Sequence, residues 1–213
     1  MKSIQIRIYF YSIITLLLMT IANFAQSSPA EIEQALFDEL NKARTNPQSY
    51  IAHLEEYKKL FKGKNIEYPN MIMLTYEGTA AVDEAIKFLR NAAKLEPLKY
   101  STGLAKPAKV QLNDLLENYS LGHKGKNGSN LPKRVARFGK GGKLYAENIM
   151  NQVSNPKDIV MMLIIDDGLR GRGHRKNIFN KTFKQVGIAF GNGKKNDPIS
   201  VMVFTDNFIE TIR

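Results

Sequence analysis

The 213-residue sequence contains no cysteine and no tryptophan, and it has only three histidines. Without cysteine, no disulfide can stabilise the fold. A domain of about 150–190 residues does not need one, because it buries roughly 70% of its unfolded surface in its own core. A lack of cysteine is usual in reducing compartments, but exported domains of this size also fold without disulfides. The N-terminal residues are therefore a better guide to the compartment.

Several other sequence motifs are missing, and each absence reduces the number of protein classes to which the chain can belong. No G-x-S-x-G string is present, which excludes the usual serine nucleophile of the α/β-hydrolases. Gly139, Gly141 and Gly142 are not followed by G-K-[ST] and follow no expected strand, so a phosphate-binding loop is not indicated. No internal repeat, no domain linker and no second long apolar segment is found. A single domain with an N-terminal appendage is expected.

The first residues have the pattern of a cleavable signal peptide. Lys2 and Arg7 form a short basic region, and residues 8–24 carry no charge and include a long apolar run. Small residues follow this run, and no basic stop-transfer cluster does. We therefore expect residues 1–25 to be a signal peptide and residues 26–213 to be one secreted, extracellular domain. Cleavage after Ala22 and a retained membrane anchor are the alternatives.

The remainder of the chain is basic. The whole sequence has a formal charge of +11, and removal of Lys2 and Arg7 leaves 29 basic against 20 acidic side chains, or +9. Much of the excess lies in residues 124–143 and 170–176. Such an exported surface favours peripheral contact with anionic lipid headgroups, glycans or cell walls over nucleic acid. Each cluster can also be a solvated face that only confers solubility.

Apolar spacing predicts helices in the first part of the chain and strands at its end. Helical periodicity covers 31–44, 78–94, 101–118 and 157–166, with a further helical turn starting at Asn46-Pro47. Two short strands, 185–190 and 199–205, flank a turn rich in glycine and asparagine and form a hairpin. Residues 58–69 and 123–144 are expected to be connections, and the second is long enough to suggest a functional or mobile loop.

The three histidines have different surroundings. His53 lies in a helical segment, where a structural or surface role is usual. His123 and His174 lie next to glycines in polar segments, which packing explains less well. Their separation in sequence is not a metal-binding signature. From the residues alone, metal ligation and a buried hydrogen-bonded network both remain open.

Five strings distributed along the chain resemble the CAP (SCP) superfamily of cysteine-rich secretory proteins, antigen 5 and plant pathogenesis-related proteins. They are Leu40–Pro47, Leu98–Ala108, Tyr145–Ile149, Gly173–Asn180 and Phe183–Phe190, in the order and spacing of that superfamily. The resemblance extends from about residue 31 to residue 208. Because cysteine and tryptophan are absent, the chain is most similar to the disulfide-free bacterial or protist type.

The resemblance implies an α+β fold, a three-layer α-β-α sandwich with a central cleft containing two histidines and two acids. The histidines fall on His123 and His174, and the first acid falls on Glu147. The second acid, usually a glutamate, falls on Asp166, with Asp167 as the neighbouring candidate. An aspartate at this position departs from the pattern, since its side chain is one methylene shorter.

Two functions follow from this cleft. In the first, the protein is an extracellular binding module for a lipid, sterol, glycan or protein partner, with zinc or another divalent metal held by His123 and His174. In the alternative, the same cleft is a metal-dependent hydrolase, a peptidase or esterase, with Glu147 as the candidate catalytic residue. A purely structural network of the histidines and acids needs no metal at all.

Overall fold

The computed structural model describes residues 27–68, 71–118, 122–194 and 197–211. The expected signal peptide, residues 1–25, lies outside them. Within these ranges, no helix combines the length and the apolar character that a membrane span requires.

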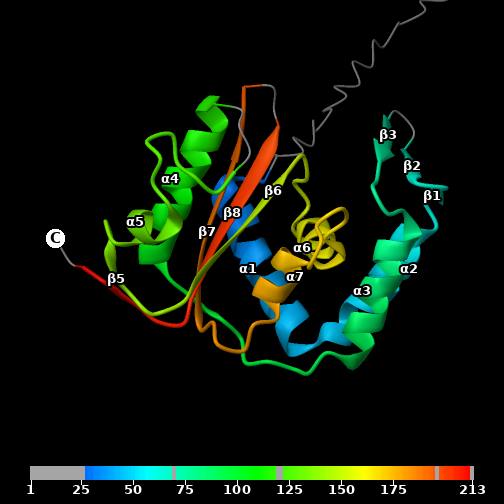
Figure 1. Cartoon of the computed structure of the whole chain (residues 1–213), viewed down its shortest axis with the longest axis horizontal. Coiled ribbons are helices and arrows are strands. Elements are labelled where there is room, and N and C mark those ends of the chain that lie inside the picture. Colours follow the sequence, from blue (N-terminus) through cyan, green and yellow to red (C-terminus); the bar gives the residue numbers. More distant parts are fainter. Residues whose placement is uncertain (1–26, 69–70, 119–121, 195–196, 212–213) are drawn as a thin grey trace, which may run out of the picture.

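A four-stranded sheet forms the centre of the molecule (Figure 1). The strand order is β4-β7-β8-β6, with β4 parallel to β7 and the other pairs antiparallel. The expected hairpin is present as its two central strands. The strands of this sheet are β4 (Lys99–Tyr100), β6 (Tyr145–Asn151), β7 (Gln185–Asn192) and β8 (Pro198–Thr205).

Helices cover both faces of this sheet. Successive side chains of β8 accordingly pack into two different cores. Val201 and Val203 point into a core shared with α4. Met202 and Phe204 point into the larger core shared with α1 and α6. Because successive strand residues face opposite sides, the nearly continuous apolar run of β8 supplies both cores. The helices involved are α1 (Pro29–Thr45), α4 (Thr102–Asn118), α5 (Leu131–Val135), α6 (Pro156–Ile165) and α7 (Gly173–Ile178). The result is the expected three-layer α-β-α sandwich.

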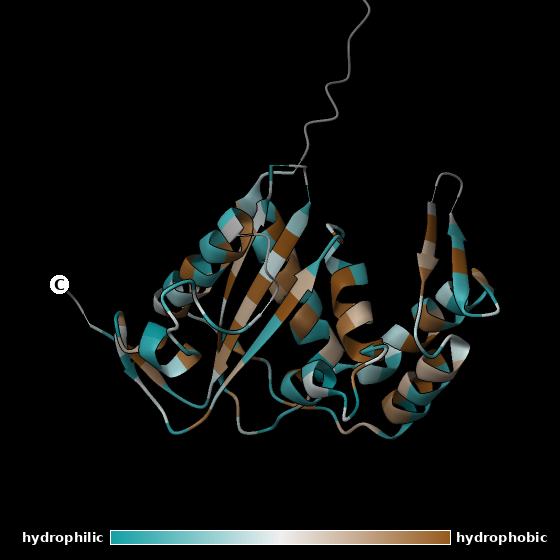
Figure 2. Ribbon diagram, turned by 45° about the horizontal axis from the view of Figure 1, so that its top comes forward, coloured by the Kyte–Doolittle hydropathy of each residue, from teal (hydrophilic) through white to brown (hydrophobic). Residues whose placement is uncertain are grey.

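A further group of elements lies beyond α6, outside the three layers (Figure 1). The segment expected to be only a connector, residues 58–69, contributes β1 and β2 to a small antiparallel sheet of order β1-β2-β3. We call this group the annex: η1 (Pro47–Tyr50), α2 (Ile51–Lys58), β1 (Phe61–Lys62), β2 (Asn65–Tyr68), β3 (Met71–Leu74) and α3 (Thr79–Asn91). Apolar residues are prominent on both β3 and α6 (Figure 2).

The long connection after α4 is also more structured than its composition indicates. It contains α5 and the short strand β5 (Gly139–Gly141), which pairs with β9 (Phe208–Glu210). Asn130 caps α5 through its side chain, and Pro132 occupies the first turn, where its missing N–H costs nothing. The many basic residues and glycines of this segment give no helical pattern from which the short helix can be predicted.

Candidate functional site

His123 and Glu147 form the first half of the candidate site. The Nδ1 atom of His123 lies 3.0 Å from Oε1 of Glu147 on β6. The Glu147 side chain is only 2% exposed, whereas that of His123 is 59% exposed. This hydrogen bond raises the pKa of the His123 imidazole against the opposing effect of burial. The geometry holds the ring by Nδ1 and leaves Nε2 for another partner.

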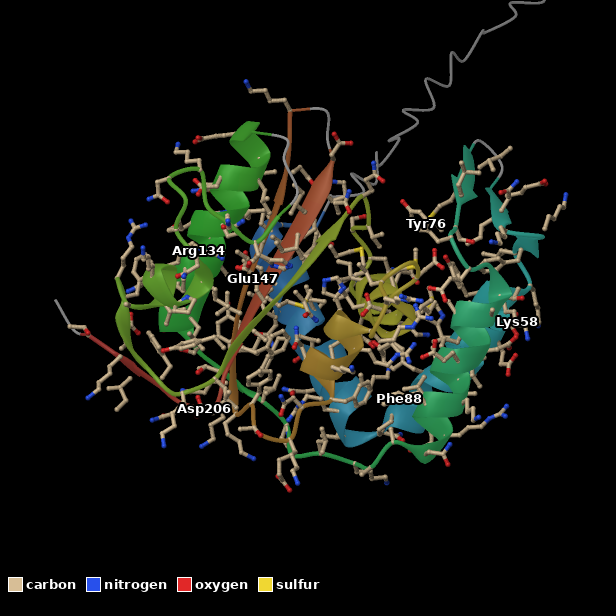
Figure 3. All side chains as sticks on the ribbon, in the orientation of Figure 1. Lys58, Tyr76, Phe88, Arg134, Glu147 and Asp206 are labelled. Carbon is tan, nitrogen blue, oxygen red and sulfur yellow. The ribbon has the colours of Figure 1, made fainter. Side chains whose placement is uncertain are left out.

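Arg134 on α5 is the third residue of this half, and it contacts Glu147 from the protein interior. Its guanidinium is fully buried and forms a short ion pair with Oε2 of Glu147 (Figure 3). The same guanidinium donates to the backbone oxygens of His123, at 2.9 Å, and Ser129, at 3.2 Å. Both oxygens of Glu147 are therefore occupied. Arg134 neutralises a buried carboxylate and fixes the loop that carries His123.

His174 and Asp166 form the second half. Asp166 accepts hydrogen bonds from the His174 backbone amide and from Nδ1 of the ring, each at 2.8 Å. It ends α6 in the left-handed conformation, with φ 56° and ψ 44°, which directs its side chain toward the start of α7. The short aspartate reaches His174 because its backbone turns at this position. As in the first half, the ring is held by Nδ1.

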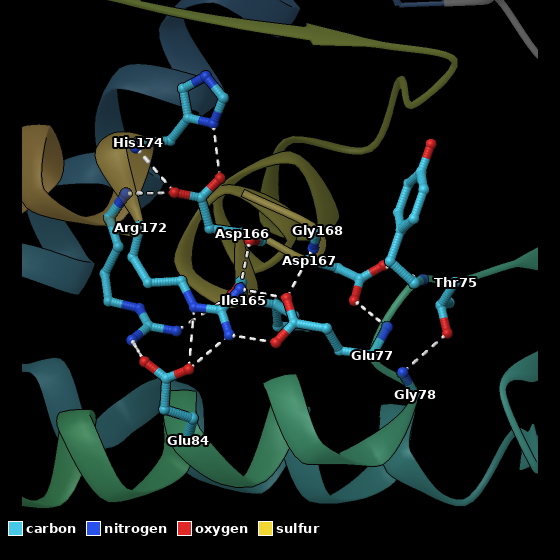
Figure 4. Close-up of polar contacts among 12 residues, drawn as sticks. Thr75, Glu77, Gly78, Glu84, Ile165, Asp166, Asp167, Gly168, Arg172 and His174 are labelled. Carbon is cyan, nitrogen blue, oxygen red and sulfur yellow. Dashed lines mark hydrogen bonds and ion pairs between the residues drawn. The ribbon is translucent and has the colours of Figure 1, made fainter. Parts of the chain in front are cut away.

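Asp167 has a different role. Its two carboxylate oxygens accept the backbone amides of Tyr76, at 2.7 Å, and Glu77, at 2.9 Å (Figure 4). Arg172 strengthens the same junction, because it donates to Glu77 and to Glu84 of α3. Asp167 therefore attaches the annex to the loop after α6, while Asp166 contacts the histidine.

Adjacent residues of β6 connect the two halves. Glu147 holds the ring of His123, and Asn148 donates to the backbone oxygen of His174 at 3.1 Å. Asn177 of α7 donates in turn to Oδ1 of Asn148 at 2.8 Å. Since neighbouring strand residues face opposite sides, the side chains of Glu147 and Asn148 leave β6 on its two faces. The halves are thus anchored to consecutive residues of one edge strand.

In each half, the histidine is oriented as a metal-binding imidazole commonly is. A carboxylate on one imidazole nitrogen fixes the tautomer and leaves the other nitrogen as the ligand, an arrangement common at zinc-binding histidines. Both halves have it. In the described part of the chain, however, no cluster of three or more histidine, cysteine, aspartate or glutamate side chains is arranged to hold a metal. A metal at this site would need water or a bound ligand to complete its coordination.

Sequence reasoning missed the supporting residues of the site. In the sequence, Arg134 belongs to a basic segment that is typical of a solvated loop, and Asn148 stands out only within one of the strings that resemble the CAP superfamily. Arg175 also belongs to a basic run, yet it is buried and donates to the Ile164 and Ile165 carbonyls and to Glu84. The position of Arg134 next to the Asn130-Leu131-Pro132 helix start was the one available signal that its loop was ordered.

Comparison with known proteins places this chain in a family. The model of the CAP, cysteine-rich secretory protein family matches residues 37–205. The uncharacterized protein YkwD of Bacillus subtilis (strain 168) is 25% identical over 115 residues, covering 52% of this chain and 43% of that protein. The chain thus matches less than half the length of this curated relative.

Two solved structures are similar at lower identity. An outer surface protein from Borrelia burgdorferi is 19% identical with a TM-score of 0.47, covering 68% of this chain and 98% of that one. Venom allergen-like protein 4 of Schistosoma mansoni is 13% identical with a TM-score of 0.42, covering 82% and 88%. The family match extends over most of the chain, from α1 to the end of β8. The chain therefore belongs to the CAP, cysteine-rich secretory protein family.

Proposed function

We propose that this protein is a binding module that acts outside the cell and holds a divalent metal, zinc in the first instance, between His123 and His174. The observation that carries the proposal is the matched environment of the two rings. Each donates its Nδ1 proton to a buried carboxylate, Glu147 or Asp166, and each keeps Nε2 for a ligand.

The metal would supply an open coordination position for an oxygen atom of a bound partner. Glu147 and Asp166 orient the two rings, and Arg134 pairs with Glu147. A two-histidine site binds metal weakly, and protons compete for it. Because the pKa of His123 is raised, zinc affinity should decline as the pH falls.

A binding role fits these residues better than the hydrolase alternative. A general base must reach a water molecule, but Glu147 is buried and both its oxygens are engaged by His123 and Arg134. Asp166 is equally occupied by His174. Both acids are placed to orient imidazoles, and neither is free to activate water.

Export rests on the expected signal peptide together with the basic charge of the remaining chain. A lipid, sterol, glycan or protein outside the cell remains the proposed class of partner. Anionic surfaces are a further proposed contact of the basic loops, with attachment that weakens as salt rises.

Zinc content after equilibrium dialysis tests the metal proposal. We expect about one zinc per chain for the wild type and a large loss in both His123→Ala and His174→Ala. His53→Ala is the matched control, because the third histidine pairs at 2.8 Å with Asp158 in the first turn of α6, whereas Asp166 lies at the other end of that helix. Equal zinc content in all four proteins would contradict the proposal.

A further inference from the structure

A small apolar pocket lies where the annex meets the sandwich. Its volume is about 240 Å³, and its lining comes from α2, β1, β3, the segment between β3 and α3, β6, α6, the loop that follows α6, and His174 of α7. Phe61, Met73 and Leu74 form the annex side, and Met162 and Ile165 form the α6 side. The pocket thus lies between two parts of the fold that are joined nearby by the contacts of Asp167.

Three consecutive residues of β6 also line this pocket: Ile149, Met150 and Asn151. Side chains of consecutive strand residues point to opposite faces. Indeed, Ile149 packs on the core beneath α4, while Met150 packs on the core shared with α1 and α6. A single pocket can contact all three only if it lies beside the strand, at its edge.

The edge in question is the outer edge of the sheet. β6 is the terminal strand of the order β4-β7-β8-β6, and within the described ranges its only strand partner is β8. A terminal strand presents N–H and C=O groups that can pair with another extended chain. Such strand addition is a common way of binding peptides, with side-chain specificity supplied by neighbouring pockets.

The size and rim of the pocket indicate what it accepts. Leu74 is 75% exposed and Leu169 is 47% exposed, and both belong to the lining. Exposed apolar side chains around a hollow mark a binding surface. A cavity of about 150 Å³ can hold benzene, and small-molecule sites typically exceed about 300 Å³. A pocket of 240 Å³ therefore suits one large aliphatic or aromatic side chain.

The charge of the lining argues against an anionic amphiphile. The charged or titratable side chains there are Asp166, Asp167 and His174, apart from the tyrosine hydroxyl of Tyr57, and the described lining includes no lysine or arginine. A fatty-acid carboxylate would meet two carboxylates and no fixed cation, which is unfavourable. A neutral side chain on a peptide avoids this repulsion.

We propose that the outer edge of β6 binds an extended peptide segment, which pairs with the strand and inserts one large apolar side chain into this pocket. The inference goes beyond the metal site, because neither the strand edge nor the apolar lining requires a metal. It commits to a peptide rather than a lipid as the occupant.

Fluorescence polarisation with labelled, acetylated nonapeptides tests the proposal. The peptides alternate threonine and valine and carry phenylalanine, leucine or aspartate at the centre. We expect the phenylalanine or leucine peptide to bind at least about ten-fold more tightly than the aspartate peptide, as a loss of about 1.4 kcal/mol corresponds to ten-fold. N-methylation of the amides that face β6 should abolish binding, whereas N-methylation of the intervening amides should leave it unchanged. Failure of both apolar peptides to bind, or indifference to N-methylation, overturns the proposal.

Matched variants distinguish binding in the pocket from nonspecific hydrophobic binding. Leu74→Asp and Leu169→Asp should weaken the phenylalanine peptide at least about ten-fold. Ile72→Asp is the control, because Ile72 lies on the same strand as Leu74 and is 61% exposed but does not line the pocket. An equal loss of peptide affinity in Ile72→Asp contradicts the proposal. So does tight binding of dodecanol by a protein that binds none of the peptides. Zinc content of Leu74→Asp should stay at the wild-type level, so failure of either idea is distinguishable from failure of the other.

Discussion

Asp166 accepts both the backbone amide and the ring Nδ1 of His174 at 2.8 Å, so one carboxylate sets the start of α7 and the orientation of the imidazole. A single side chain thus serves the fold and the candidate site together. Its neighbour Asp167 instead accepts the backbone amides of Tyr76 and Glu77 at the annex junction. This division yields a paired test.

Asp166→Asn should weaken zinc binding about 10–100-fold, since loss of the partner that orients a metal-binding histidine has this effect. It should also lower the free energy of unfolding by about 1 kcal/mol through loss of a cap-like contact. Zinc titration and urea unfolding measure the two effects. Asp167→Asn is the control: it should loosen the annex and leave zinc affinity unchanged. Similar zinc losses in both variants would refute the assignment of Asp166.

Arg134→Met should destabilise the protein by about 3–5 kcal/mol, because it leaves the buried carboxylate of Glu147 without its cation. Removal of both charges in Arg134→Met/Glu147→Met should recover a large part of this loss. Urea unfolding of the two single variants and the double variant completes the cycle. Additive losses would show that the ion pair does not contribute as described.

Arg44→Lys should cost about 1.5–3 kcal/mol or more, as hydrogen bonds to a charged group are lost inside the protein. The buried Arg44 donates to the carbonyls of Glu96, Ile178, Asn180 and Phe183, joining α1 to the segments around α7 and β7. An ammonium cannot reproduce a planar fork of donors. Arg90→Lys is the control, because its 3.7 Å ion pair with Glu55 is exposed and should be worth at most about 1 kcal/mol. In thermal and urea unfolding, the Arg44→Lys variant should be clearly less stable than the Arg90→Lys variant.

The annex junction should weaken in acid. The hydrogen bonds from Arg172 and then the Gly168 amide lower the pKa of Glu77 from 4.5 to about 2. A lowered carboxyl pKa stabilises the folded state above the unfolded value and loses that effect as the pH falls through the folded value. The difference in melting temperature between wild type and Glu77→Gln should therefore be largest near pH 7, narrow below about pH 4.5 and vanish near pH 2. A constant difference across this range would contradict the role of Glu77.

Much of the sandwich was predictable because its elements carry local signals. Ser28 and Glu31 form a capping box at the start of α1, and Asn155-Pro156 begins α6 within a residue of its expected start. The apolar runs of β7 and β8 identified the central hairpin. The strand β6 was not predicted, because Glu147 and Asn148 interrupt its apolar pattern with buried polar groups that belong to the site.

The supporting cations could not be predicted for a different reason. Composition counts Arg134 and Arg175 with the exposed lysines around them, but burial depends on partners far away in sequence. Arg134 is buried because β6 places Glu147 beside it, and Arg175 because α6 presents two carbonyls and α3 presents Glu84. Only the tertiary arrangement distinguishes these arginines from a solvated face.

X-ray absorption at the zinc edge tests the central claim most directly, because it reports which atoms surround the metal in the loaded protein. We expect two imidazole nitrogens at about 2.0–2.1 Å per zinc, completed by oxygen, in a protein with one zinc per chain. His123→Ala and His174→Ala should each lose that two-imidazole signature. A wild-type spectrum with a single imidazole per zinc, accompanied by two zincs per chain, would show that the histidines bind separately and would contradict the shared site.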